Sequence, residues 1–497
     1  MNEHISDSHA RRLFLGSCIA LISTSVAFAT VGAVMLSLKS EFVLSNAQVG
    51  WIGGAALWGF AVSQLVFAPL CDTLGMRFLL RMSFAGHIAG TLVMVFASGF
   101  WMLFTGALII ALANGLVEAA CNPLVATLYP DNKTVKLNQF HVWFPGGIVL
   151  GGLAAYGLDA VSIESWQIKL ALIIVPTIIY GFLLLREEFP QTEGVQSGVS
   201  MGEMFKATFT TPLMLLALVC IAMTGSVELG PNRWVPAVME SGGLPGILVL
   251  VWINGLMAVM RYRAGDVVHR LSPTGILLAS AVVAGIGLYW LSYAETGVVA
   301  FAAATVFALG VCYFWPTMLG FVSERIPKTG ALGLGLMGAV AMFTVGLVTA
   351  PQMGRIADEY AHRQFEPEVV SSVLESSVQQ LREDIPTVPE PVATDMQTAI
   401  DASSQVVDYY EETGDLPELS TADAMRLIIS SGAEKSVTQP VNAILGPADN
   451  YGGRISFRYV VPLCGVLAII FLLLFLGDRK RGGYQVVRIN EHDGEDG

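Results

Sequence analysis

The sequence predicts an all-α membrane protein in which twelve transmembrane helices form two pseudo-symmetric six-helix bundles. Three observations lead to this fold class: the composition, the spacing of long apolar windows, and the similarity of the two halves. The chain of 497 residues is 54% apolar and only 13% charged, with a mean hydropathy of +0.62. Polar surface could not cover so apolar a chain in water, so lipid must solvate much of it.

Apolar windows of the length that a bilayer requires recur along the chain. A spanning helix needs roughly 20 mostly apolar residues. We expect twelve spans, beginning near Arg12, Ala47, Phe78, Trp101, His141, Ile168, Pro212, Gly246, Thr274, Gly297, Ala331 and Tyr459.

The first window has an alternative interpretation as a cleaved signal. Arg11 and Arg12 precede an apolar run that contains a small-residue site at 27–29. The run continues to Leu38, which is too long for a typical signal, and its removal would leave eleven helices. We therefore expect a span there.

Basic residues indicate the orientation, because Lys and Arg in short loops stay on the cytoplasmic side. Pairs such as Arg77 with Arg81, Lys133 with Lys136, and the run from 479 to 481 all fall on one face. Both termini are therefore predicted to be cytoplasmic, in a plasma (inner) membrane.

The spans separate into two groups of six, joined by a polar linker. The expected divisions are an N-tail (1–11), an N-terminal bundle (12–185), a cytoplasmic linker (186–206), helices seven to eleven (207–352), an acidic extracytoplasmic insertion (353–454), helix twelve (455–477) and a C-tail (478–497).

The two halves carry similar turns, as expected for parallel repeats. One turn lies between spans two and three and the other between spans eight and nine. We interpret both as conformational turns, although two basic turns could also look alike through the positive-inside rule alone. Their residues are Asp72, Gly75 and Arg77 in the first, and Arg261, Gly265 and Arg270 in the second.

The insertion before the last span accounts for nearly all of the negative charge. Residues 353–454 hold 18 acidic and 6 basic residues, a net charge of −12 against −13 for the whole chain. Amphipathic windows at 367–384 and 393–412, and a third after Ser420, predict a small helical domain. Its role stays open between substrate capture, partner contact and a tolerated insertion.

Two carboxylates lie within the spans, where an ionisable group needs water or a partner. In span four, Asn114, Glu118 and Asn122 follow one another at i, i+4 and i+8, which places them on one helical face. We expect a wet stripe there, with Glu118 as the proton-coupling group and both asparagines binding solute.

Span seven repeats this pattern with Glu228 and Asn232, followed by Trp234. Gly230-Pro231 is predicted to break the helix and free carbonyls for substrate. An ion pair between Glu228 and Arg233 is the alternative to a binding role.

Further candidates for solute binding are His141 in span five and Tyr313 and Trp315 in span ten. Imidazole exchanges protons near neutrality, and aromatic faces stack on sugar rings. Interfacial anchoring or packing is the alternative for each. The chain has no Walker loop, GxSxG or HExxH motif, so we expect no enzyme, cofactor or metal.

On these residues the chain resembles the major facilitator superfamily, and within it the L-fucose:proton symporter family. The segment from Ala111 to Pro123, containing Glu118 and Asn122, is similar to that family's helix-four motif, and Leu137-Asn138 follows as in the family. The resemblance implies alternating access, a sugar-like substrate, and Glu118 as either the protonatable group or the acceptor of a sugar hydroxyl. The family's acidic residue in helix one is missing here.

The expected function is secondary active transport of a small polar solute, with proton coupling as an option. The expected partners are the solute, a proton and the lipid bilayer; we expect a monomer that binds no nucleic acid. A non-transporting sensor or receptor and a lipid or amphipathic-drug translocator are the alternatives. The sequence does not identify the solute, the coupling ion or the direction.

Overall fold

The computed structural model describes residues 6–42, 44, 46–243, 246–418 and 420–489. These residues form helices and connecting turns, with no strand among them. Eleven helical stretches are long and apolar enough to cross a membrane, and the shorter α13 (Gly246–Tyr262) is the twelfth apolar segment. Each lies where the sequence predicts a span.

The first bundle contains six spans, two of which are interrupted. They are α1 (Asp7–Glu41), α2 (Asn46–Phe67), α4 (Met76–Val95), α5 (Phe100–Leu128), α6 with α7 (Lys133–Phe140 and Trp143–Ala160), and α8 with α9 (Trp166–Ala171 and Ile174–Leu184).

The second bundle repeats this plan after a linker with α10 (Glu193–Gln196) and α11 (Met201–Thr210). Its spans are α12 (Pro212–Ser241), α13, α14 (Ala264–Leu291), α15 with α16 (Gly297–Val311 and Phe314–Arg325), α17 continued by a π-helical turn and α18 (Gly330–Thr344, Val345–Thr349 and Ala350–His362), and α22 (Lys435–Lys480).

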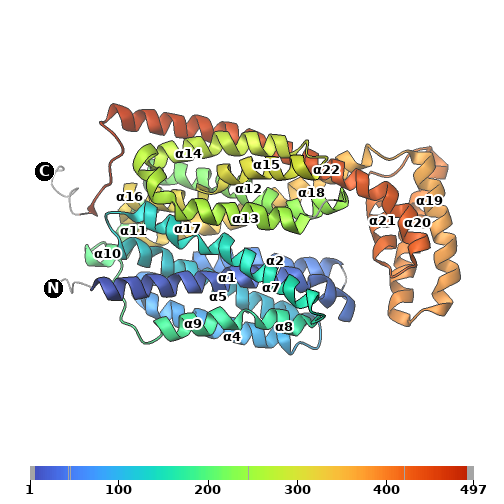
Figure 1. Ribbon diagram of the computed structural model, residues 1–497, viewed down its shortest axis with the longest axis horizontal. Helices are drawn as coiled ribbons and strands as arrows, with labels where there is room; N and C mark the ends of the chain where they lie inside the picture. Colours follow the sequence, from blue (N-terminus) through green and yellow to red (C-terminus); the bar gives the residue numbers. More distant parts are fainter. Residues whose placement is uncertain (1–5, 43, 45, 244–245, 419, 490–497) are drawn as a thin grey trace.

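The two bundles lie side by side, with both chain termini at one end of the molecule and the insertion at the other (Figure 1). We call these the termini end and the insertion end. The bundles meet where α2 packs on α17, α6 on α16 and α7 on α13. At the first of these seams, a Cβ on Gly335 would lie 2.0 Å from that of Ala68, so glycine permits the close approach.

The insertion forms a small helical domain with its own apolar core. Its helices α19 (Pro367–Asp384), α20 (Glu390–Thr413) and α21 (Ser420–Ser430) match the three amphipathic windows. They pack with the first part of α22 around a core that runs from Ala361 to Ala448. Because α22 is continuous over 46 residues, the insertion joins the last span without a loop at 454.

Two of the interrupted spans, one in each bundle, free backbone groups inside the molecule at their breaks. One break separates α6 from α7 at His141 and Val142, and the other separates α15 from α16 at Cys312 and Tyr313. A buried carbonyl at such a break needs another hydrogen-bond donor in place of the helix N–H that it lacks. Both breaks face the same place between the bundles.

Candidate solute site

A small cavity lies between the two bundles, and charged side chains from both line it. Its volume is ≈ 20 Å³, which holds about one water molecule. Ligand sites usually measure roughly 300–1,000 Å³, so the bundles are closed around this point. The lining residues are Glu118, His141, Phe144, Glu228, Leu229, Arg261, Trp315 and Met342.

On the first bundle, Glu118 is held between an asparagine and a histidine. Asn122 Nδ2 donates to Glu118 Oε2 at 3.1 Å, across one turn of α5. His141 Nε2 lies 3.7 Å from Glu118 Oε1, and both side chains are almost fully buried. The predicted grouping of Glu118, Asn122 and His141 is present in the structure.

The surroundings of His141 determine where its protons can be. Its Nδ1 lies 2.9 Å from the carbonyl oxygen of Leu137, which can only accept, so Nδ1 carries a hydrogen. Its Nε2 has no hydrogen-bond partner among the described residues. When neither atom carries a hydrogen, Nε2 of His141 and Oε1 of Glu118 face each other with lone pairs, which repel. A hydrogen on either atom would make the contact attractive.

On the second bundle, Arg261 is the centre of the polar contacts. Its Nη2 donates to Glu228 Oε1 at 2.7 Å, and its Nε donates to the carbonyl of Cys312 at 2.6 Å. Its Nη1 donates to the carbonyl of His141, in the other bundle, at 3.1 Å. Arg261 thus uses the carbonyls at both helix breaks and links the bundles directly.

The charges of the site are not balanced without a proton. Glu118 and Glu228 supply two negative charges when ionised, and Arg261 supplies one positive charge. Counted in these ionised forms, the site carries one net negative charge, and burying an uncompensated charge is costly. In addition, Glu228 Oε2 at the cavity and Asn122 Oδ1, which lies outside the cavity lining, are buried without hydrogen-bond partners among the described residues.

Arg261 is a correction to the sequence interpretation, which placed it in a conformational turn. The residue belongs to α13 and is buried at the cavity. It looked like a loop residue because it ends an apolar window of only about 15 residues. The ion pair proposed between Glu228 and Arg233 is also wrong, since Arg261 is the partner of Glu228 and Arg233 is exposed.

Asn114 does not share the wet stripe with Glu118. Its Oδ1 lies 2.8 Å from Nε2 of His87, whose Nδ1 lies 3.0 Å from the hydroxyl of Tyr180. This polar cluster is buried among α4, α5 and α9, because each step of four residues turns the face by about 40°. The sequence interpretation missed His87, although a histidine in the middle of an apolar span was the available signal.

Span seven also differs from expectation. α12 continues through Gly230-Pro231 without a break, so the prediction of a broken helix is wrong. Neighbouring helices stabilise a proline inside a span, which explains its tolerance here. Asn232 is buried beside Asn254 of α13, 3.4 Å away, and does not line the cavity. Trp234 packs near Gly354 of α18 instead.

The two aromatic candidates of span ten separate in the structure. Trp315 lies in the first turn of α16 and lines the cavity. Tyr313 instead donates its hydroxyl hydrogen to the carbonyl of Met260 at 2.8 Å, and it lies outside the cavity lining. Of the pair, only Trp315 is placed to contact a solute.

The other residues predicted for the two turns lie at the termini end, and two of them, Gly265 and Arg270, belong to α14 rather than to a turn. Asp72 accepts a hydrogen bond from Thr192 of the linker at 2.6 Å, and burial raises the pKa of this carboxyl. Gly75 has a φ of 81°, which glycine adopts without strain. Arg77 faces the carbonyl of Leu185, and Gly265 lies near Val135 of the other bundle. Arg270 lines a second cavity, described below.

Two closed bundles with a charged cavity at their junction define a membrane protein that moves solutes. The family model of the Major Facilitator Superfamily matches residues 13–351, and the chain belongs to this family, whose members are transporters. The match leaves out the insertion and the last span.

Individual relatives are more distant. A hexose transporter of Saccharomyces cerevisiae, HXT17, is 30% identical over 154 residues, which cover 30% of this chain and 27% of that protein. The chain thus spans about a quarter of that relative's length. The proton:xylose symporter XylE has a TM-score of 0.58 at 15% identity, covering 70% of this chain and 90% of XylE. The outward conformation of FucP has a TM-score of 0.57 at 16% identity, covering 69% and 92%. These structures share the fold.

Proposed function

We propose that this protein is a secondary active transporter that couples movement of a small polar, sugar-like solute to a proton. The observation that carries the proposal is the cluster of Glu118, His141, Arg261 and Glu228 at the junction of the bundles. Hexose, xylose and fucose in the names of its relatives support a sugar as solute.

The charge arrangement suggests how a proton would be coupled. With a proton on the Glu118–His141 pair the site is neutral, so the bundles can close over it at little electrostatic cost. Loss of that proton leaves a net negative charge in a closed cavity, which favours reopening. The proton would therefore accompany the solute through the closed state.

Arg261 connects the two bundles when they are closed. Its contact with the His141 carbonyl joins the two bundles in the closed state and must break when they separate. Its contact with Glu228 lies within one bundle and can persist. We propose Asn122, Glu228 and Trp315 as solute-binding residues, and alternating access by rocking of the bundles.

The orientation and setting complete the proposal. The termini end carries basic residues in its short loops, which favours its placement in the cytoplasm, in a plasma membrane, with the insertion outside. The four polar or charged side chains around the cavity do not suit an amphipathic-drug or lipid translocator.

Uptake into proteoliposomes tests this function. Purified protein is assayed with labelled xylose, fucose and glucose, with and without an inwardly directed proton gradient. We expect the gradient to accelerate uptake by the native protein. In Glu118→Gln, solute exchange should continue while the response to the gradient disappears, because the amide cannot carry the proton.

Glu164→Gln is the matched control, because Glu164 is exposed near the insertion end. It should keep the full response to the gradient. Full gradient stimulation in Glu118→Gln would contradict the proton-coupling role of Glu118. Absence of uptake and of exchange for every sugar in the native protein would contradict the substrate class.

A further inference from the structure

The segment that follows α22 crosses the termini end of the molecule. It leaves the helix through Gly482 and Gly483, with φ of 87° and 121° and open space around both. Residues 484–488 then run without helical structure, and Ile489 is buried. We call residues 484–489 the strap. Two adjacent glycines in left-handed conformations provide a hinge at its start.

Specific polar contacts attach the strap to α16. The Tyr484 hydroxyl donates to Glu324 Oε2 at 2.9 Å, and the Val487 N–H donates to the Glu324 carbonyl at 2.8 Å. The Arg325 guanidinium lies 4.4 Å from the centre of the Tyr484 ring. Burial raises the pKa of Tyr484 well above its usual value, so the hydroxyl keeps the hydrogen that it donates.

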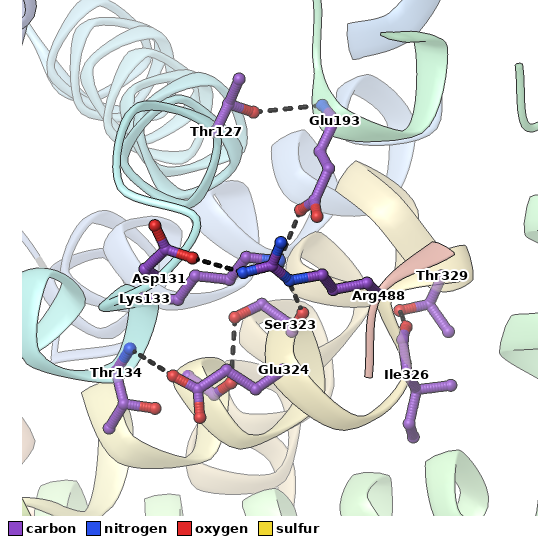
Figure 2. A network of polar contacts seen from close by, with 11 residues as sticks. Thr127, Asp131, Lys133, Thr134, Glu193, Ser323, Glu324, Ile326, Thr329 and Arg488 are labelled. Carbon is purple, nitrogen blue, oxygen red and sulfur yellow. Dashed lines mark hydrogen bonds and ion pairs between the residues drawn. The ribbon is translucent and has the colours of Figure 1, made fainter. Parts of the chain in front are cut away.

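The same glutamate also binds the opposite bundle. Its second oxygen, Oε1, accepts the N–H of Thr134 at the start of α6, at 2.9 Å (Figure 2). Beside it, Lys133 Nζ contacts the Ser323 carbonyl at 3.1 Å and Glu193 of the linker at 2.5 Å. Glu324 therefore joins α6, α16 and the strap in one network.

The strap reaches the first bundle directly as well. Arg488 Nη2 lies 2.8 Å from Asp131 Oδ1, with both side chains more than two-thirds exposed (Figure 2). An exposed pair of this kind contributes little by itself. Its position matters more, because it attaches the end of the strap across the seam between the bundles.

A hollow beneath the strap indicates that it bridges the seam rather than filling it. The cavity measures ≈ 520 Å³, and Tyr484 and Val486 of the strap line it together with residues of α6 and α14. Over this open space the strap is held by its polar attachments, by the Tyr484 ring, which packs against the apolar core, and by the buried Ile489.

We propose that the strap is a latch that holds the termini end closed by fixing Glu324 in the position that binds α6. Detachment of the strap would leave Glu324 more mobile and ease opening at this end. The proposal rests on alternating access as the proposed function, and it adds a control by the chain's own C-terminal segment.

Distance measurements between paired spin labels test the latch. Labels at Thr73→Cys and Arg263→Cys occupy exposed positions at the termini end of opposite bundles, and the six native cysteines are buried. The full chain, a chain that ends at Gly483, and Tyr484→Phe are compared without solute. The control is Gln485→Ala, because the exposed Gln485 side chain donates to the Arg481 carbonyl within its own segment, at 3.3 Å.

We expect the full chain and the control to give mainly the short distance. The ratio of long to short distances should rise about tenfold in the chain that ends at Gly483 and about threefold in Tyr484→Phe. These factors correspond to the hydrogen bonds that each variant loses. Gel filtration and thermal unfolding of each variant check that it is folded.

An unchanged distance distribution in the folded, shortened chain would overturn the latch. A shift in the shortened chain with none in Tyr484→Phe would overturn the role given to the Glu324 contact. Because the measurement needs no solute, it is independent of the substrate and the coupling ion. A failed latch would leave the uptake results standing, and failed uptake would leave the distances interpretable.

Discussion

Replacing Arg261 by glutamine is the sharpest perturbation of the site. The change removes three contacts of 2.6–3.1 Å and leaves Glu228 without its partner in a place where the two side chains are only 1% and 4% exposed. Breaking a buried ion pair from one side costs about 3–5 kcal/mol, mainly because a charge stays buried and unpaired. We expect Arg261→Gln to lose stability on this scale.

The double variant Arg261→Gln/Glu228→Gln separates the charge effect from the lost hydrogen bonds. It lacks both partners of this ion pair, so it should recover much of the loss. Glu228→Gln alone should leave the Arg261 guanidinium without its carboxylate partner and be destabilised too. Denaturant unfolding of the four purified proteins in detergent gives the coupling free energy. Additive losses in the two single variants would refute the reasoning, because the residues would then be energetically independent.

Three further predictions concern other parts of the molecule. Asn114→Leu should cost about 1–3 kcal/mol in thermal unfolding, because Nε2 of the buried His87 loses its hydrogen-bond partner. The response of uptake to a proton gradient should remain, and loss of that response would return Asn114 to the solute site. Gly452→Ala should lower the free energy of unfolding by at least about 1–3 kcal/mol, because a Cβ there would lie 2.0 Å from the carbonyl oxygen of Ala357. The control Gly465→Ala, where a Cβ would lie in open space, should unfold like the native protein. Asp72→Asn should be neutral or stabilising at pH 7. Burial raises the pKa of Asp72, so its charged form disfavours the folded state at a pH above that pKa. The difference in stability from the native protein should vanish as the pH falls below the pKa of an aspartate in the unfolded chain, near 4. A loss of stability at pH 7 in unfolding scans would contradict that sign.

Hydropathy was sufficient to predict the spans and the helices of the insertion. Twelve apolar windows and three amphipathic ones correspond to helices because the bilayer fixes span length and each helix must bury one face. The boundary expected at 454 does not coincide with a loop, because α22 passes from the insertion into the last span while its surroundings change from water to lipid.

The site was partly predictable. Glu118, Asn122 and His141 follow from polar residues at depths where lipid does not tolerate them. Arg261 could not be assigned, because its partners are carbonyls at two helix breaks and Glu228, 33 residues earlier. Asn114 shows the opposite error. Its spacing of four residues from Glu118 predicted a place at the cavity, but the rotation of the helical face over those four residues directs its side chain to His87 instead.

Proton movement accompanying the solute is the most direct test of the central claim. A pH electrode in a weakly buffered suspension of proteoliposomes, with no imposed gradient, should record alkalinisation outside when a transported sugar is added, at one proton for each sugar molecule. In Glu118→Gln the sugar should enter without that alkalinisation. Sugar entry into native vesicles with no change in external pH would contradict the account.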